Sequence, residues 1–343
     1  MINYFIREFY LLIVTIVLLL LVLFLMTYQF PVPHYVSLTG IMDPTVQQLV
    51  LMKEYYLIGS GFFSEFLAFV SLRLNGEMGL SMTSQSNIAQ ELAQVIPAST
   101  ELGFCALLLA LTLGTPLGIF AALSRKKWFK ESTIFFTLSV YSIPIFWFGI
   151  LLSLYLGIYA NILPVSGRIN LLYDIPHSTG FLLIDILLSD VPYKWDAFSD
   201  AIQHIILPAC MLAIYPFAIM ARITYSSMTE VMNTNYIQAT QARGLSTFKI
   251  VFNHALPNAM LPVIRQFSLM LGGFFTYGII NEVIFSWPGI GHWLILGIFQ
   301  RDYTVIQSGV LMISLFIVCA SFVIDMIYML TNPLSRKELY GSN

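Results

Sequence analysis

The residues of this sequence that could bind a metal ion, attack a bond or hold a nucleotide form no known catalytic pattern. The five histidines have no metal-ligand spacing, and the HExxH motif is absent. The three cysteines lie far apart inside apolar stretches, as small buried side chains do. A GxxxxGK(S/T) phosphate-binding loop is also absent. We therefore expect that this protein is not an enzyme and that it has no metal site and no cofactor of its own. The net charge of −2 also predicts no binding to nucleic acid.

Three polar side chains lie inside apolar segments, where burial makes them costly. Asn281 and Glu282 close one such segment, and Asp325 lies in the last third of another. Polar groups in such positions often line a path for ions or solutes. Glu282 could instead reach the surface beside Trp287, and Asp325 could pair with Arg336. We treat Asn281, Glu282 and Asp325 as candidates for such a path, with these structural roles as the alternative.

Segment 233–262 has the pattern of two short helices joined by a glycine. Asn235 can cap a first helix, and Gly244 can end it in the left-handed conformation that glycine adopts at little cost. Ser246 can cap a second helix, which Pro257 would stop. The predicted helices are Tyr236–Arg243 and Phe248–His254. By itself, this helix–glycine–helix elbow could be a packed connector or a docking surface.

The elements that position these residues follow from a very apolar composition. Hydrophobic residues make up 58% of the 343 residues and charged residues 10%, compared with roughly 45–50% and 25% in soluble domains. A bilayer can be crossed by a helix of about 20 apolar residues. We therefore predict an all-α integral membrane protein with six spans. The spans are Phe9–Tyr28, Leu102–Leu123, Ile134–Ala160, Ile205–Ile223, Leu261–Phe285 and Val305–Leu330.

Lysine and arginine counts predict the orientation of these spans. The connections on one side carry eleven basic residues and those on the other side carry five. Basic residues are enriched on the cytoplasmic side of membrane proteins. The eleven include Arg7 near the N-terminus and Arg336 with Lys337 near the C-terminus, so both termini are predicted to be cytoplasmic.

The chain is expected to form one membrane domain with folded segments on its outer side. A seventh span over 47–69 is an alternative, but Lys53, Glu54 and Glu65 interrupt that stretch. The expected divisions are 1–99 for the first span and outer segment, 100–330 for the core spans, and 331–343 for a cytoplasmic tail.

The residues that begin at Pro97 have the composition expected at the start of the second span. A hydroxyl at Ser99 or Thr100 can cap the helix, and a carboxylate at Glu101 suits the positive end of the helix dipole. We predict this capping role for Glu101, in preference to a functional carboxylate.

The elbow resembles the cytoplasmic loop of ABC importer permeases, in which E-A-A-x-x-x-G is followed after nine residues by I-x-L-P. Here Gln238-Ala239-Thr240 take the first positions, Gly244 is the glycine, and His254-Ala255-Leu256-Pro257 falls at the required distance. The glutamine, threonine and histidine depart from the general pattern. They agree better with the branch that handles dipeptides and oligopeptides, whose loop is similar to Tyr236–Leu245.

Other stretches agree with the same branch. The residues after the fifth span and before the sixth, Phe285–Gly291 and Arg301–Tyr303, resemble its turns, and Ile96–Leu102 resembles its entry to span two. Leu163–Arg168 is similar to the Sap permeases of Gram-negative bacteria, which are linked to antimicrobial-peptide tolerance. The resemblance covers almost the whole chain.

The resemblance implies a six-helix type I ABC importer permease fold in the bacterial inner membrane, with a cytoplasmic coupling loop. It implies a second homologous permease, two ATP-binding subunits that use the ATP, and a periplasmic peptide-binding protein. The residues implied to contact the ATPase are Gln238, Ala239, Thr240, Arg243, Gly244, Leu245, His254, Leu256 and Pro257.

Cargo and mechanism remain open at this point. The resemblance implies cationic or antimicrobial peptides, with dipeptide or oligopeptide import and putrescine export as alternatives. A secondary transporter that works without ATP belongs to a different class. Such proteins usually show internal repeats, broken helices or ionisable residues near the midplane, and these signals are weak here.

Overall fold

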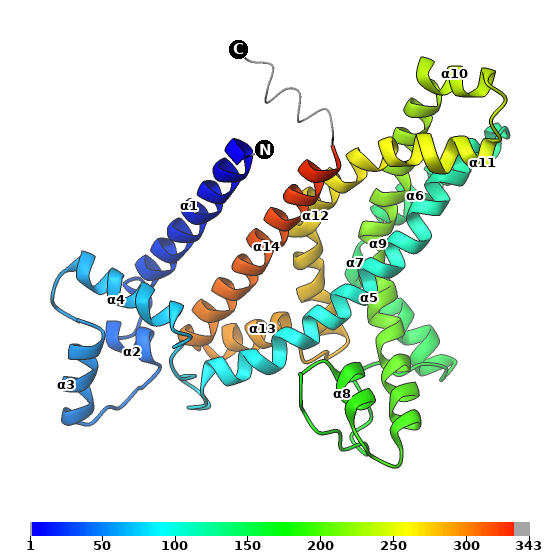
Figure 1. Ribbon diagram of the computed structural model, residues 1–343. Helices are drawn as coiled ribbons and strands as arrows, with labels where there is room; N and C mark the ends of the chain where they lie inside the picture. Colours follow the sequence, from blue (N-terminus) through cyan, green and yellow to red (C-terminus); the bar gives the residue numbers. More distant parts are fainter. Residues whose placement is uncertain (1, 333–343) are drawn as a thin grey trace.

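The computed structural model describes residues 2–332, and the regular structure in that range is helical (Figure 1). The only pairing of strand type in that range is an isolated bridge between Leu80 and Asn87. The elements are α1 (Ile2–Thr27), α2 (His34–Thr39), α3 (Val46–Tyr55), α4 (Phe62–Leu74), α5 (Ile88–Leu123), α6 (Lys127–Ser142), α7 (Ile145–Leu152), the π-helical η1 (Ser153–Tyr159), α8 (Leu182–Leu188), α9 (Lys194–Met232), α10 (Asn235–Ala242), α11 (Thr247–Ile250), the π-helical η2 (Val251–Ala255), α12 (Leu256–Ile284), α13 (Ile290–Gln300) and α14 (Tyr303–Thr331).

Five helical stretches are long and apolar enough to cross a bilayer, and α6 with the helix from α7 to η1 forms a sixth if this bent pair is one span. The five lie at Phe5–Thr27, Ile88–Leu123, Lys194–Met232, Thr247–Ile284 and Tyr303–Thr331. The all-α membrane class is therefore confirmed. The orientation of the spans stays a prediction, and most of the expected tail, 333–343, lies outside the described residues.

The third predicted span, a single helix over 134–160, is wrong in its geometry. The two halves meet at an angle of 92° at a break of a few residues. Ile143 at the break has an extended backbone (φ −73°, ψ 127°), and Pro144 follows it. Proline has no N–H to donate and disfavours helical backbone in the residue before it. Uniform hydrophobicity across the break concealed this effect.

The predicted start of the second span is also wrong. Helix α5 begins at Ile88, where the side chain of Asn87 accepts a hydrogen bond from the amide of Ala89 at 2.9 Å. Pro97 lies inside the helix instead of at its start. Ser99 and Glu101 therefore have no capping role, and both side chains are free to bond to other parts of the chain.

Among the described helices, α5 and α9 make the most extensive contact. A Cβ atom added at Gly118 of α5 would lie 2.5 Å from the carbonyl oxygen of Ala221 in α9. Only glycine allows the two backbones to approach so closely. Toward α8, the contact between α5 and α9 continues through alanine side chains. The buried cluster in that part includes Ala98 and Ala106 of α5 and Ala209 of α9.

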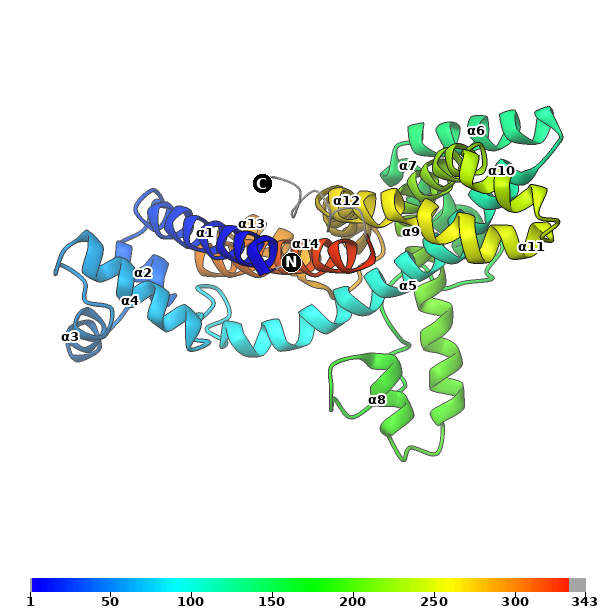
Figure 2. The same ribbon diagram turned by 45° about the horizontal axis from the view of Figure 1, so that its top comes forward.

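The outer segment between α1 and α5 forms α2, α3 and α4, and α4 and the loop after it are attached to the last span. Buried Arg73 of α4 donates to the side chain of Gln307 in α14 at 3.2 Å, and Gln307 donates to the carbonyl of Leu23 in α1 at 2.9 Å. Asp302, the N-cap of α14, accepts from the hydroxyl of Ser81 at 2.6 Å. Figures 1 and 2 show α1 and α14 side by side, so the first span packs against the last.

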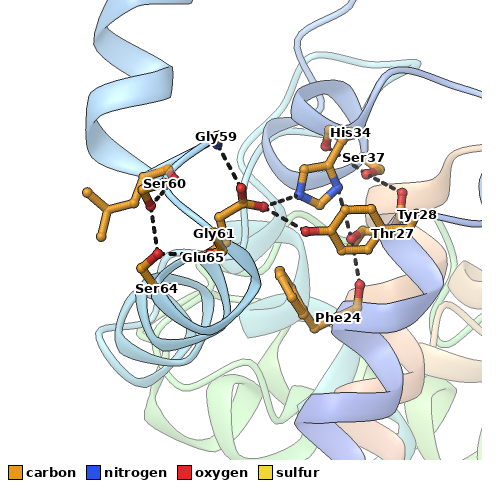
Figure 3. Close-up of polar contacts among 11 residues, drawn as sticks. Phe24, Thr27, Tyr28, His34, Ser37, Gly59, Ser60, Gly61, Ser64 and Glu65 are labelled. Atoms are coloured by element: carbon orange, nitrogen blue, oxygen red, sulfur yellow. Dashed lines mark hydrogen bonds and ion pairs between the residues drawn. The ribbon is translucent and has the colours of Figure 1, made fainter.

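Three side chains hold the outer end of α1 to α4 (Figure 3). The hydroxyl of Tyr28 donates to Glu65 at 2.7 Å, and His34 Nε2 lies 3.3 Å from the same carboxylate. The rings of Tyr28 and His34 stack at 4.1 Å. Burial lowers the pKa of His34 below 6.5 despite the nearby Glu65. Burial alone would raise the pKa of Glu65, but hydrogen bonds from Tyr28 and Gly59 and the nearby His34 hold it below its usual 4.5.

Both shifts predict that acid loosens this outer segment. Below pH 6.5 the unfolded chain takes up a proton at His34 more readily than the folded chain does, so stability falls. Glu65 adds a further loss below pH 4.5, because its carboxylate is stabilised only when folded. Limited proteolysis of membranes at about pH 7.5 and about pH 5 should show faster cleavage within 30–87 at the lower pH. His34→Gln should remove most of this difference; an equal acceleration in both proteins would contradict the prediction.

Candidate functional site

The predicted elbow lies at the end of the molecule opposite to α2, α3 and α8 (Figure 1). Helix α10 follows α9 and α11 leads through η2 into α12, so the elbow joins two of the membrane-crossing helices directly. The N-terminal end of α1 lies on this same side of the molecule. A displacement of the elbow would therefore be transmitted to both spans that it connects.

The inner face of the elbow is buried against the end of α9. Ile237 and Thr240 of α10 are buried, and Ile237 belongs to a cluster with Met228 of α9. The same cluster contains Ile250, Val251, Ala255 and Ala259. The hydroxyl of Ser227 also donates to the carbonyl of Ala259 at 2.8 Å. The elbow is thus packed on the spans as one body.

Gly244 makes the turn between the two short helices. Its φ is +77°, in the left-handed region, and a Cβ atom added there would meet nothing within 4 Å. The constraint at this position is therefore purely conformational. Ser246 caps α11, its hydroxyl accepting from the amide of Lys249 at 3.5 Å.

Two details of the predicted elbow are wrong. Helix α10 has Thr234 as its N-cap residue, and Asn235 is already helical. Pro257 does not stop the second helix, because the chain continues from α11 through η2 into α12 without a break. Pro257 is the second residue of α12, and the wider π-helical turn of η2 lies directly before it.

The outer face of the elbow is exposed and mixes apolar with basic side chains. Gln238, Ala239 and Arg243 of the predicted set are exposed there. Phe248 and Phe252 are 72% and 48% exposed, and their rings lie 4.4 Å apart. These two aromatic residues were not predicted from the sequence, although their spacing of four on a helix flanking Lys249 places them on one face.

The remaining predicted residues of the elbow lie between its two faces. His254 is half-buried, and its Nδ1 lies 2.7 Å from the hydroxyl of Tyr236, which joins η2 to α10. Leu245 and Leu256 are half-buried beside the inner cluster, and Pro257 is exposed. No group of histidine, cysteine and carboxylate side chains suited to a metal ion occurs in the described part of the chain.

Glu282 and Asn281 are buried contacts between helices. Glu282 accepts from the hydroxyl of Ser99 at 2.5 Å and from the amides of Gly291 and His292 at 2.7 and 3.0 Å. These bonds attach the start of α13 to α5 and α12. Asn281 donates to the carbonyl of Pro208 in α9 at 2.7 Å. In this structure both side chains therefore hold helices together.

Asp325 lies apart from the other two candidates. It is half-buried on α14, interacts with Ser268, and is close to Arg265 of α12 and Glu8 of α1. The structure therefore does not bring the three predicted path residues together into one site.

A buried ion pair near the outer end of α5 was not predicted. The guanidinium of Arg168 contacts the carboxylate of Glu101 at 2.5 Å, with 11% and 6% of the two side chains exposed. Arg168 also lies over the ring of Trp287 at 5.6 Å, and Glu101 accepts from the amide of Leu183 at 2.9 Å. The pair therefore joins α5 to the loop before α8. No local signal could reveal a pair that is 67 residues apart in sequence.

The helical architecture and the elbow agree with a known family of transport proteins. Residues 114–337 match the family described as the inner membrane component of binding-protein-dependent transport systems. The chain belongs to this family. It is therefore an inner-membrane permease component, and the permease identity predicted from the sequence is confirmed.

Curated relatives of this permease include members of the predicted dipeptide branch and of the Sap permeases. The di/tripeptide transport system permease protein DppB of Pseudomonas aeruginosa is 41% identical over 276 residues, covering 80% of this chain and 81% of the relative. The putrescine export system permease protein SapB of Escherichia coli is 37% identical, covering 83% and 89%. The peptide transport system permease protein SapB of Salmonella typhimurium is 36% identical with the same coverage.

Proposed function

We propose that this permease is the membrane subunit of an ATP-driven peptide transporter, and that the ATP-binding subunits act on its elbow. The observation that carries the proposal is the two-faced elbow: one face is packed on α9 and α12, and the other is exposed. The chain has no phosphate-binding loop, so ATP would be bound and hydrolysed by two partner subunits. A second, homologous permease and a periplasmic peptide-binding protein would complete the system.

The exposed face suits a protein partner. The stacked pair Phe248 and Phe252 offers apolar area that water solvates poorly, and Arg243 and Lys249 supply positive charge beside it. Aromatic and arginine side chains are enriched at the centres of protein interfaces. An acidic groove on an ATP-binding subunit would complement this surface.

Peptides are the cargo class that the relatives favour, since two of the three are peptide permeases by name. Cationic or antimicrobial peptides remain the first proposal, with dipeptides and oligopeptides next. The name of the Escherichia coli relative keeps putrescine export as a second candidate. A secondary transporter is disfavoured by membership of a binding-protein-dependent family.

The proposal is tested in a strain that lacks this chain and in its complemented parent, with labelled cationic peptide and labelled putrescine. Peptide uptake should disappear with the chain and return with the wild type. Phe248→Ser with Phe252→Ser should restore little uptake, whereas Phe63→Ser, at a 70% exposed phenylalanine of the outer segment, should restore it fully. Unchanged peptide uptake with impaired putrescine export would overturn the proposed cargo and direction.

A further inference from the structure

We propose that Tyr141, Tyr215, Tyr277 and Arg222 form a site along the path of the cargo, and that this site takes peptides through their carbonyl oxygens and their free C-terminal carboxylate. The inference deepens the proposed function and rests on it. The four side chains of the proposed site come from α6, α9 and α12. None of them belongs to the elbow or to the buried contacts described above.

The four side chains form a continuous row. The rings of Tyr277 and Tyr215 lie 4.8 Å apart, and the ring of Tyr215 stacks on that of Tyr141 at 5.8 Å. The guanidinium of Arg222 lies 5.8 Å from the centre of the Tyr141 ring. Arg222 follows Tyr215 by two helical turns on the same face of α9, about 10 Å nearer the elbow. The row therefore extends along the span direction.

The polar groups of the row have no protein partners within residues 5–332. None of the three hydroxyls makes a hydrogen bond there, and Arg222 makes neither a hydrogen bond nor an ion pair. Tyr141 is 47% exposed and Arg222 is exposed, while Tyr215 and Tyr277 are half-buried. Ionisable side chains within spans are rare and commonly mark a solute path.

The break between α6 and α7 lies directly beside the row. Tyr141 is the second-last residue of α6, and Pro144 caps the next helix without a side-chain hydrogen bond. Non-helical backbone at membrane depth is tolerated where it is buried in protein or lines a water-filled cavity. Ser142 and Pro144 are exposed, so the described part of the chain does not cover the backbone at the break. The first amides of α7 add further donors on this side.

The chemistry of the row selects its ligand. Hydroxyls donate to carbonyl oxygens, aromatic faces pack against peptide planes, and a guanidinium binds a carboxylate through two parallel hydrogen bonds. None of the four side chains carries a negative charge, so the row offers no counter-ion to a polyamine. Gly273 makes room for Tyr215, since a Cβ atom there would lie 2.9 Å from its hydroxyl. The row therefore favours peptide acids over putrescine.

The test uses cells that carry the whole transport system and compares uptake of a labelled tripeptide with its C-terminally amidated form. Arg222→Gln should lower the ratio of acid to amide uptake about tenfold, the effect of one lost charge-assisted contact, and Arg222→Lys should lower it less. A binding protein would affect the ratio of acid to amide uptake equally in the wild-type and variant strains. A difference in this ratio between strains therefore reports on the permease. Arg125→Gln, at an exposed arginine between α5 and α6, is the matched control.

A second measurement covers the case in which the amide is not transported at all. A tripeptide acid carrying benzoylphenylalanine should label α6, α9 or α12 near the row on illumination, and excess unlabelled acid should prevent this. An unchanged ratio in Arg222→Gln at equal membrane level, or labelling confined to other helices, would overturn the inference. Failure of the proposed function would be seen differently, as the absence of peptide uptake in the wild type.

Discussion

Gly244→Val should abolish the stimulation of partner ATPases by cargo while leaving the permease in the membrane. The left-handed φ of +77° at this position is a rare conformation for a β-branched residue and costs roughly 1–3 kcal/mol. The added side chain meets no neighbour within 4 Å, so the strain acts on the turn itself and not on the packing around it. A cost of this size lowers the population of the seated elbow by about 5-fold to 150-fold. Stimulated ATP hydrolysis by the reconstituted transporter measures the effect.

Gly244→Asn is the matched control for this experiment. Asparagine tolerates the left-handed conformation better than other residues with a side chain, and it adds comparable bulk. It should keep most of the stimulated hydrolysis. Normal stimulation in Gly244→Val would show that the elbow need not keep its turn, and would end the coupling role of this glycine.

The second large effect is expected at the buried pair of Glu101 and Arg168. Replacing Glu101 by Gln leaves the guanidinium buried without a counter-ion, and removing one partner of such a pair costs about 3–5 kcal/mol. With 11% and 6% of the two side chains exposed, water can compensate little of this loss. The melting temperature of the purified permease in detergent should fall by an amount on the order of 10 °C.

Two further variants decide whether the loss comes from the unpaired charge. Glu101→Gln combined with Arg168→Met removes both charges and should recover much of the melting temperature. Glu131→Gln breaks the exposed pair of Lys127 and Glu131, whose side chains are 88% and 64% exposed. This variant should leave the melting temperature unchanged. A double variant as unstable as the single one would instead assign the loss to packing around Arg168.

The sequence predicts most of the apolar architecture and the pattern of the elbow. Hydrophobicity over some 20 residues is a local property that lipid makes decisive, so the first and last spans lie where expected, in α1 and α14. Gly244 was placed correctly because a glycine with cap residues on both sides has few other interpretations. Membership of the permease family was visible in the same segment.

The features that the sequence did not predict have two origins: competition between nearby caps and breaks, and pairing between distant parts of the chain. Pro97 looks like a helix start, but Asn87 provides a cap ten residues earlier and the helix continues through the proline. Pro144 breaks a helix inside an apolar run of similar composition. The sequence predicts Glu282 as a possible path residue, yet its carboxylate accepts a hydrogen bond from Ser99, which is 183 residues away in sequence. A single sequence contains no signal for such pairings.

The packing of α1 against α14 has a consequence for how this protein is made. The outer segment is fastened by Gln307 and Asp302, both of which belong to the last part of the chain to be synthesised. About 280 residues separate the end of α1 from the start of α14, and a ribosome needs on the order of 15–55 s to add them. During that time Arg73 can donate to the carbonyl of Glu77 but lacks its partner Gln307, and Ser81 lacks its partner Asp302. Newly inserted chains are therefore most exposed to proteases at their N-terminal end, until the final helix enters the bilayer.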